Sequence, residues 1–321
     1  MNKMQASLVT ALGLSLLVVM LGAYTRISDS GLGCPDWPGC YGQLTVPSNE
    51  TEITAAETAF PNAKPVIAEK AWPEMIHRYL AGSLGLFVAS IAAYHLYHGI
   101  QRQAAGLLLF LIFFQATLGL WTVTLKLHPL VVMLHLIGGF TISILLLWLL
   151  LGKKKSHTPL DKWAYIILAI ILMQVFFGAW TSANYSSLIC PDFPFCQGKV
   201  FPPMNFQEAF SMLMPFGADY EFGVLDNISR VTIHMTHRYF AIVTCFGIIS
   251  FLICAYHQQR ASVIAISIVA SLLALQILLG ILNVILLLPI PIALAHNLCG
   301  LLLLLSWICL THSLYDNTST I

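Results

Sequence analysis

Long apolar segments alternate with polar segments along almost the whole chain. Eight of them are long enough to cross a bilayer about 30 Å thick, which takes about 20 helical residues. Backbone polar groups in lipid must be paired within the segment, so such segments predict helices. The pattern therefore predicts an all-α integral membrane protein with eight transmembrane helices. The segments lie near residues 5–25, 73–98, 104–126, 129–151, 161–183, 231–256, 261–286 and 290–312.

The polar segments predict an orientation in the membrane. Residues 26–72 and 184–230 form two long links, and the other links are short. Short links rich in Lys and Arg face the cytoplasm, so we expect both termini in the cytoplasm and both long links outside. The basic residues that set this orientation are Lys3, Arg102, Lys153, Lys154, Lys155, Lys162 and Arg260.

Composition agrees with a membrane protein. The 321 residues are 58% hydrophobic and 9% charged, whereas a soluble domain carries about 25% charged residues. The net charge is +1 and no basic stripe occurs, so we expect no nucleic-acid partner. The lipid bilayer is therefore the predicted partner of the helix surfaces.

The two halves of the chain repeat one another. Each half contains four predicted spans and one long link, so both halves insert the same way up. This predicts two tandem, pseudo-symmetric four-helix bundles, residues 1–151 and 152–321. The matches are LGAYT (21–25) with FGAWT (177–181), CPDWPGC (34–40) with CPDFPFC (190–196), EMIHRYLA (74–81) with HMTHRYFA (234–241), FQATLGLWTV (114–123) with LQILLGILNV (275–284), and LHLIGG (134–139) with AHNLCG (295–300).

The repeat selects four of the eleven histidines: His77 and His135 in the first half, His237 and His296 in the second. All four fall inside predicted spans, where an ionisable group is costly and marks a functional site. Within each half the two histidines lie roughly 8–9 Å below the outer end of their spans, at 1.5 Å per residue. Two facing imidazoles in a helical bundle suit the axial positions of haem iron. The alternatives are hydrogen bonds to backbone carbonyls and a zinc site.

Three other residues accompany these histidines. Arg78 and Arg238 directly follow His77 and His237; they either extend to the membrane surface or pair with a haem propionate. His128, at an outer boundary, is expected to lie at the membrane interface.

Glu74 marks a difference between the halves, because His234 occupies the matching position. Glu74 and His77 are three residues apart and share a helix face, so we expect Glu74 to point toward whatever His77 binds. A carboxylate there can accept or donate a proton. The alternative is an interfacial carboxylate paired with Arg78 or Lys70.

Each long link carries a pair of cysteines, Cys34 with Cys40 and Cys190 with Cys196. Thiols outside the cytoplasm are usually oxidised, and the intervening prolines favour a tight turn. The pairs are therefore either two disulfides that hold the loops in place or, for at least one pair, groups that exchange electrons with a thiol partner.

The motifs GLGCPDWPGC, EMIHR, HLIGGF, CPDFPFC, HRYFA and AHNLCG, in this order over eight spans, resemble the haem A synthases of bacteria and mitochondria. The resemblance covers nearly the whole chain. It implies an enzyme that oxidises the C8 methyl of haem O to a formyl group, which gives haem A for cytochrome oxidase. The extra polar stretches near 47–70 and 201–229 depart from shorter members of this family.

The resemblance also implies a place for each residue. The substrate haem O, and the product haem A, would lie between His77 and His135, and haem B between His237 and His296. Glu74 would be the essential glutamate, Cys34 and Cys40 the cysteine pair linked to activity, and Cys190–Cys196 a structural disulfide. The implied partners are haem O synthase and cytochrome oxidase assembly factors, with a homo-oligomer left open. The implied location is the bacterial inner membrane.

Three other classes compete with this interpretation. A di-haem membrane cytochrome that only transfers electrons would need the same four histidines, but not Glu74 or the cysteine loops. A thiol-oxidising membrane protein would need the cysteines but not the histidines. A transporter would explain the repeat and leave the histidines without a purpose.

Overall fold

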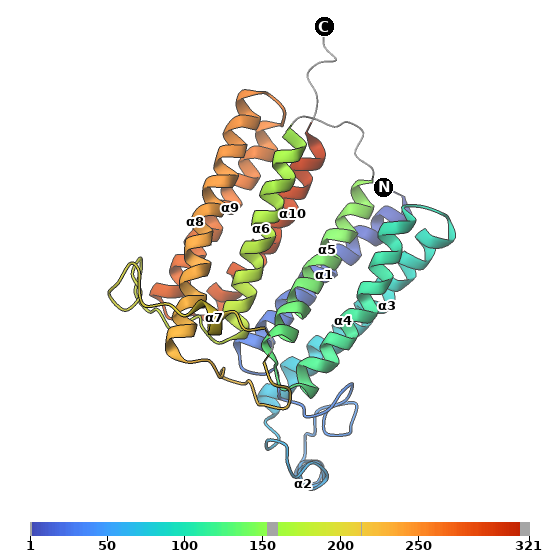
Figure 1. The fold of residues 1–321 in the computed structure, drawn as a ribbon. Coiled ribbons are helices and arrows are strands. Elements are labelled where there is room, and N and C mark those ends of the chain that lie inside the picture. Colours follow the sequence, from blue (N-terminus) through green and yellow to red (C-terminus); the bar gives the residue numbers. More distant parts are fainter. Residues whose placement is uncertain (1, 153–159, 213, 315–321) are drawn as a thin grey trace. The chain divides into compact units, whose positions relative to one another are not determined.

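A computed structural model describes residues 2–152, 160–212 and 214–314, and it is all-helical apart from two isolated bridges (Figure 1). Lys153, Lys154 and Lys155 lie outside the described residues. Eight helices of this part are long and apolar enough to cross a membrane, which confirms the eight predicted spans. The helices are α1 (Lys3–Ile27), α2 (Glu50–Ala59), α3 (Ala68–Tyr97), α4 (Arg102–Thr124), α5 (Pro129–Leu151), α6 (Leu160–Ala183), α7 (Phe206–Ala209), α8 (Asn227–His257), α9 (Val263–Ile285) and α10 (Ile290–Ser313).

The chain forms two compact units. The first contains Met1–Leu150 and Met212–Val224, and the second Leu151–Ser211 and Leu225–Ile321. Residues 214–224, which the sequence predicts in the second half, therefore belong to the first unit. The pseudo-symmetry between the halves stays a prediction.

In the first unit, α1, α3, α4 and α5 lie side by side (Figure 1). Their contact faces are apolar, and burial of such side chains stabilises the unit by about 25 cal/mol per Å². Polar contacts also join these helices, for example the hydroxyls of Ser15 and Ser143, which are 3.0 Å apart. The buried core residues are Leu8, Ala11, Leu84, Val88, Ile91, Ala92, Leu108, Leu146 and Leu149.

In the second unit, α6, α8, α9 and α10 form the bundle, and large aromatic side chains fill its core. The rings of Phe251 and Trp307 have centroids 4.8 Å apart. The Trp307 indole N–H donates to the backbone carbonyl of Ala164, 3.2 Å away, so its polar atom is paired in the apolar core. Trp180 is paired in the same way with the carbonyl of Ala209 at 2.8 Å.

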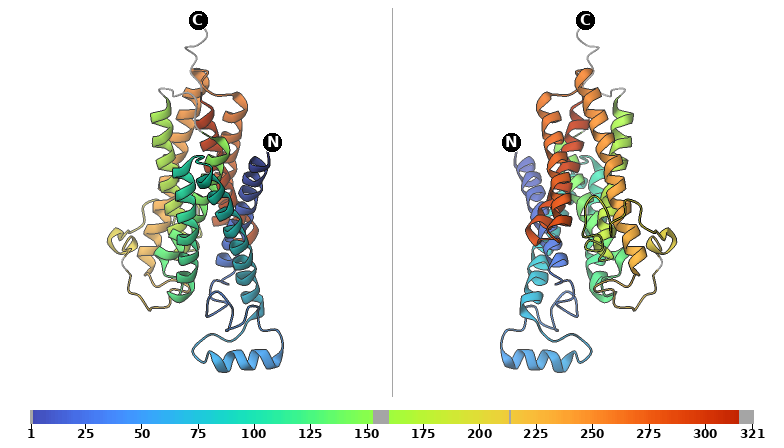
Figure 2. Two further views of the ribbon diagram at one scale, coloured as in Figure 1. Left: turned by 90° about the vertical axis from the view of Figure 1, so that its right-hand side faces the viewer. Right: turned by 90° about the vertical axis from the view of Figure 1, so that its left-hand side faces the viewer.

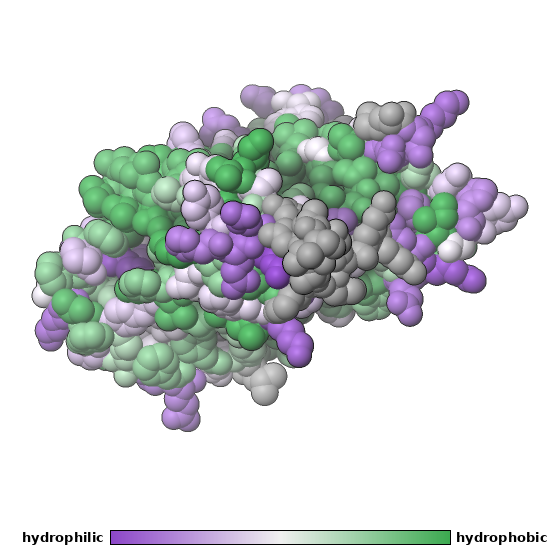
Figure 3. Space-filling model, turned by 90° about the horizontal axis from the view of Figure 1, so that it is seen from above, coloured by the Kyte–Doolittle hydropathy of each residue, from purple (hydrophilic) through white to green (hydrophobic). Residues whose placement is uncertain are grey.

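The surface of the spans is apolar where it would meet lipid. Figure 3 shows hydrophobic residues over much of the face seen from above, with hydrophilic residues between them and at the margins. Phe113, Phe246 and Ile264 are examples of large apolar side chains exposed on different spans. Such a surface is unfavourable in water and expected in a bilayer, so the protein is an all-α integral membrane protein.

The first long link crosses the end of the first unit. Its helix α2 lies crosswise to the long helices and beyond their ends (Figure 2). Asn49 caps this helix by accepting a hydrogen bond from the backbone N–H of Glu52 at 2.9 Å. The link ends at Ala68, the first residue of α3. This helix therefore begins five residues before the predicted span.

Residues 214–224 of the second link pack on this same end of the first unit. His128 is 2% exposed, and its ring contacts those of Phe216 and Tyr220, with centroids 5.3 and 5.0 Å away. The backbone N–H of Tyr220 donates to the carbonyl of Lys126 at 3.1 Å. His128 is therefore covered by the second link, and its expected place at the membrane interface stays a prediction.

Candidate functional site

His77 and His135 face each other in the first unit. His77 belongs to α3 and His135 to α5, and their ring centroids are 6.4 Å apart with the planes at 80°. Metal–imidazole bonds are about 2 Å long and the ring centre lies about 1 Å further, so two imidazoles on opposite sides of one metal have centroids about 6 Å apart. The observed separation fits a pair of axial ligands of one haem iron.

Glycines on neighbouring helices make room for the histidine rings. A Cβ atom on Gly22 of α1 would lie 2.8 Å from Cε1 of His77, and one on Gly119 of α4 would lie 3.5 Å from Cε1 of His135. The same arrangement occurs in the second unit, where Gly178 faces His237 at 3.1 Å and Gly280 faces His296 at 3.2 Å. Each of the four histidines selected by the repeat therefore packs its ring against a glycine.

In the part of the chain that the structure describes, three of the four histidines have a buried ring nitrogen without a partner, and all four have accessible rings. All four are partly exposed although they lie within the spans, so their rings can contact a ligand. Among the described residues, Nδ1 of His77, His135 and His296 is buried and has no hydrogen-bond partner. A buried polar atom without a partner calls for an explanation. Ligation of a haem iron by these imidazoles would supply one, so the residues present fit a haem.

In the second unit, His237 belongs to α8 and His296 to α10, and each ring has a glutamine amide beside it. The Gln174 amide nitrogen is 3.1 Å from Nδ1 of His237, and the Gln276 amide nitrogen is 3.3 Å from Nε2 of His296. No cluster of three or more His, Cys, Asp or Glu residues suited to a metal ion occurs in the part of the chain that the structure describes.

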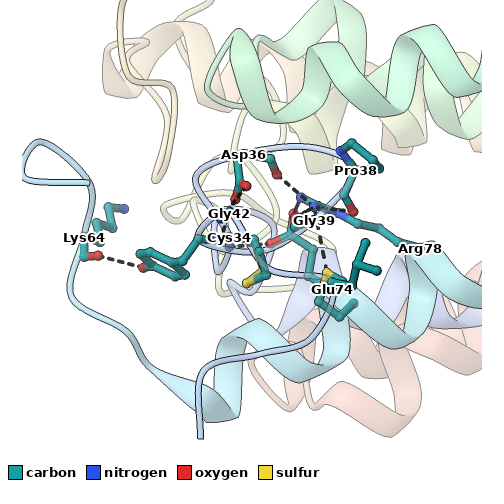
Figure 4. The surroundings of a disulfide bond; sticks show 12 residues. Cys34, Asp36, Pro38, Gly39, Gly42, Lys64, Glu74 and Arg78 are labelled. Atoms are coloured by element: carbon teal, nitrogen blue, oxygen red, sulfur yellow. Dashed lines mark hydrogen bonds and ion pairs between the residues drawn. A yellow bond between two sulfur atoms is a disulfide. The ribbon is translucent and has the colours of Figure 1, made fainter. Parts of the chain in front are cut away.

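The first cysteine loop is closed by a disulfide and held by Arg78. Cys34 and Cys40 are bonded, with Cα atoms 4.8 Å apart, and both are fully buried. The carboxylate of Asp36 accepts from the backbone N–H groups of Tyr41 and Gly42 at 2.6 and 2.8 Å, which closes the turn after the disulfide. Figure 4 shows the Arg78 guanidinium reaching from α3 into this loop, where it donates to the carbonyls of Asp36 and Gly39.

The second cysteine loop has the same construction. Cys190 and Cys196 are bonded, with Cα atoms 4.6 Å apart. Arg238 donates to the carbonyls of Asp192, Phe195 and Cys190 at 2.8–3.0 Å. The Asp192 carboxylate accepts from the backbone N–H groups of Gly198 and Gln197, and these bonds lower the pKa of Asp192.

Both arginines therefore fasten the cysteine loops to the helix that carries the histidine. The predicted pairing of Arg78 and Arg238 with haem propionates stays a prediction, since their N–H groups here bond the loops. The cysteines are buried in both loops, so a redox reaction of either disulfide needs the loop to open before a thiol can reach sulfur.

Glu74 joins the first cysteine loop to Arg78. It is 5% exposed, its Oε2 accepts from the backbone N–H of Cys34 at 2.9 Å, and its Oε1 is paired with the Arg78 guanidinium. The sequence left open that Glu74 pairs with Arg78. The structure contains this ion pair, and the carboxylate is buried. The backbone partner Cys34 was not foreseen, because it comes from a loop 40 residues away in sequence.

His234, at the matching position of the second unit, makes a different contact. Its Nδ1 lies 2.8 Å from the backbone carbonyl of Ser186, and the residue is 5% exposed. In this unit the second guanidinium nitrogen of Arg238 bonds the Cys190 carbonyl directly. A buried carboxylate between the arginine and the cysteine loop is thus a feature of the first unit.

Sequence reasoning missed the glutamines beside the histidines. Gln115, Gln174 and Gln276 each lie four residues before a glycine that faces a histidine. The signal was present in the matched segments FQATLGLWTV and LQILLGILNV, which share this spacing.

Comparison with known proteins places the chain in a family. The family model described as "Cytochrome oxidase assembly protein" matches residues 5–308. A heme A synthase of Shewanella oneidensis is 41% identical over 315 residues, which cover 95% of both chains. Heme A synthases of Neorickettsia sennetsu and Caulobacter vibrioides are 24% and 23% identical; the first match covers 91% of this chain and 93% of the relative, and the second covers 87% of both. The chain therefore belongs to the cytochrome oxidase assembly protein family.

Proposed function

We propose that this protein is a haem A synthase that oxidises the C8 methyl group of haem O to a formyl group, giving haem A for cytochrome oxidase. The observation that carries the proposal is the His77–His135 pair, spaced for one haem iron, with His77 on the same helix as the buried carboxylate of Glu74. The 41% identity to a protein named heme A synthase supports it.

The first unit is proposed to hold the substrate. Haem O would be bound by His77 and His135, one turn of α3 from Glu74. With water as the oxygen source the reaction is –CH3 + H2O → –CHO + 4 H⁺ + 4 e⁻, so the site must accept protons and an acceptor must take electrons. Glu74 is the proposed first proton acceptor, because it is the buried carboxylate on the helix that carries His77. Arg78 and the Cys34 N–H would hold it in place.

The second unit is proposed to hold haem B between His237 and His296. The bound group would supply a one-electron redox centre. The chain orients both imidazoles by packing them against Gly178 and Gly280. The position that Glu74 holds in the first unit is taken here by His234, whose Nδ1 faces the Ser186 backbone carbonyl.

The proposed location is the bacterial inner membrane, with both termini in the cytoplasm and both cysteine loops outside. Haem O synthase is the proposed source of the substrate, and cytochrome oxidase assembly factors are the proposed recipients of the product.

Pigment extraction after expression with and without haem O synthase tests the function. We expect haem A only in the coexpressing cells. Haem B alone in both would instead support the di-haem cytochrome that only transfers electrons.

Replacing Cys34 and Cys40 together by serine should lower haem A output about tenfold or more, because the loop that bonds Glu74 would lose its closure. Replacing Cys190 and Cys196 should have a smaller effect, since no carboxylate on the histidine helix depends on that loop. The measurement is haem A per haem bound in the two double variants. Equal losses would remove the distinction between the loops.

Replacing Gly22 by valine should lower haem occupancy of the first site by about 10-fold or more, the size of losses seen when ligand orientation is disturbed. The new side chain would displace His77, because a Cβ on residue 22 would lie only 2.8 Å from Cε1 of that ring. Gly13→Val is the matched control on the same helix, because a Cβ there meets nothing within 4 Å. Haem content measured on purified protein compares the two, and similar values would contradict the proposed place of the substrate.

A further inference from the structure

Arg26 lies in the last turn of α1, on the face of this helix that contacts the two histidine helices of the first unit. On this face, Gly22 packs against the ring of His77 on α3. Val19 packs against α5, where a Cβ on Gly139 would lie 3.6 Å from Cγ2 of Val19. Arg26 follows Gly22 by four residues and Val19 by seven, so at 3.6 residues per turn it lies between these two directions.

Arg26 and Glu74 lie at the same level of the first unit. The Thr25 hydroxyl contacts the backbone carbonyl of Pro73 at 3.3 Å, and Arg26 and Glu74 are the residues that follow these two. Arg26 is one helical turn beyond Gly22, which packs against the His77 ring, and Glu74 is three residues before His77. Because α1 and α3 run in opposite directions here, both side chains lie about one turn from the histidine level, toward the cysteine loop.

The Arg26 side chain is largely buried, being 15% exposed. A charged group inside a membrane span is costly and marks a functional site. Its guanidinium lies 4.0 Å from the carboxylate of Asp29, which is 39% exposed, and such a pair is weak. A guanidinium carries five N–H groups, so it can bind a second carboxylate beside Asp29. Arg78, in contrast, bonds Glu74 and the carbonyls of the cysteine loop.

We propose that Arg26 binds a propionate of the haem held by His77 and His135. Arginine is suited to this, because its N–H groups match the geometry of a carboxylate. The proposal rests on the proposed function and adds an orientation to it. Both propionates of a haem lie at one edge of the ring, and the C8 methyl is next to one of them. A propionate held by Arg26 therefore keeps the reacting methyl at the edge that is nearest to the level of Glu74.

The second unit has a different residue at this position. The match of LGAYT with FGAWT aligns Arg26 with Ser182. The arginine, like Glu74, is thus a feature of the unit that is proposed to hold the substrate, where the orientation of the haem decides which methyl group reacts.

Titration of the full-length protein with haem B and with haem B dimethyl ester, in which both propionates are esterified, tests the proposal. His296→Ala is the common background, so that only the first site is measured. Arg26→Gln should weaken the binding of haem B about tenfold or more, the loss expected for a hydrogen bond to a charged group. It should leave the binding of the ester unchanged, because the ester has no carboxylate for the arginine to bind. Lys126→Gln is the control, since it removes an exposed positive charge from the turn between α4 and α5 and should change neither affinity.

Two further measurements separate propionate binding from support of the fold. Arg26→Lys keeps the charge and should bind haem B more tightly than Arg26→Gln. The spectrum of the ester bound to Arg26→Gln should match that of the ester bound to the background protein, which shows an undisturbed histidine pair. Equal weakening of both ligands in Arg26→Gln, or an unchanged affinity for haem B, overturns this inference and leaves the proposed function standing. A background protein that binds neither ligand contradicts both.

Discussion

Replacing Glu74 by glutamine should reduce haem A formation at least about 100-fold, in the range of losses when a positioned acid–base group is removed. Glutamine has nearly the same shape and keeps one oxygen, which can accept from the Cys34 N–H or from Arg78 but not from both, and it cannot take a proton. Haem content and the spectrum of the bound haem should remain as in the wild type. The measurement is the ratio of haem A to total haem in the purified protein.

Glu74→Ala completes this test. Alanine removes both the proton acceptor and the contacts with Cys34 and Arg78, so it should add loss of stability to loss of activity. Activity kept by Glu74→Gln and lost in Glu74→Ala would show that Glu74 only holds the loop. His234→Gln is the control in the second unit, where no carboxylate is present at this position, and it should leave haem A formation largely intact.

The spans and the histidine pairs were predictable because they depend on local pattern. Hydropathy over about 20 residues defines a span, and the positions of His77 and His135 within their spans put them at the same depth. Residues 68–72 were not assigned to α3, since Glu69 and Lys70 interrupt the apolar pattern although the helix continues through them. The first turn of α3 is helical although it contains charged residues, because a helix needs apolar residues only on the face that it buries.

The contacts of the long links were not predictable, because they join segments distant in sequence. The hydrogen bond from Cys34 to Glu74 depends on how the disulfide loop folds back onto α3. The packing of residues 214–224 around His128 has no counterpart in the repeat, so the matching of halves gives no sign of it. Hydrophobic periodicity predicts the secondary structure of one segment, and it does not predict which helix a distant loop will contact.

Replacing His135 by alanine should remove the haem of the first site and lower haem A formation at least about 100-fold, because loss of a ligand costs more than loss of its hydrogen-bond partner. The haem of the second site should remain, since its ligands belong to the other unit. His296→Ala should give the converse loss of bound haem. Spectra of the two purified variants, taken with the haem-to-protein ratio, distinguish the sites.

His95→Ala is the control for both variants. His95 is buried in α3 of the first unit, and neither ring nitrogen has a hydrogen-bond partner among the described residues. It stands 18 positions after His77 in the same helix, about 27 Å along the axis at 1.5 Å per residue. Its replacement should leave both haems bound. Loss of a haem in His95→Ala, or identical spectra for His135→Ala and His296→Ala, would contradict two separate sites, because each pair draws its ligands from a single unit.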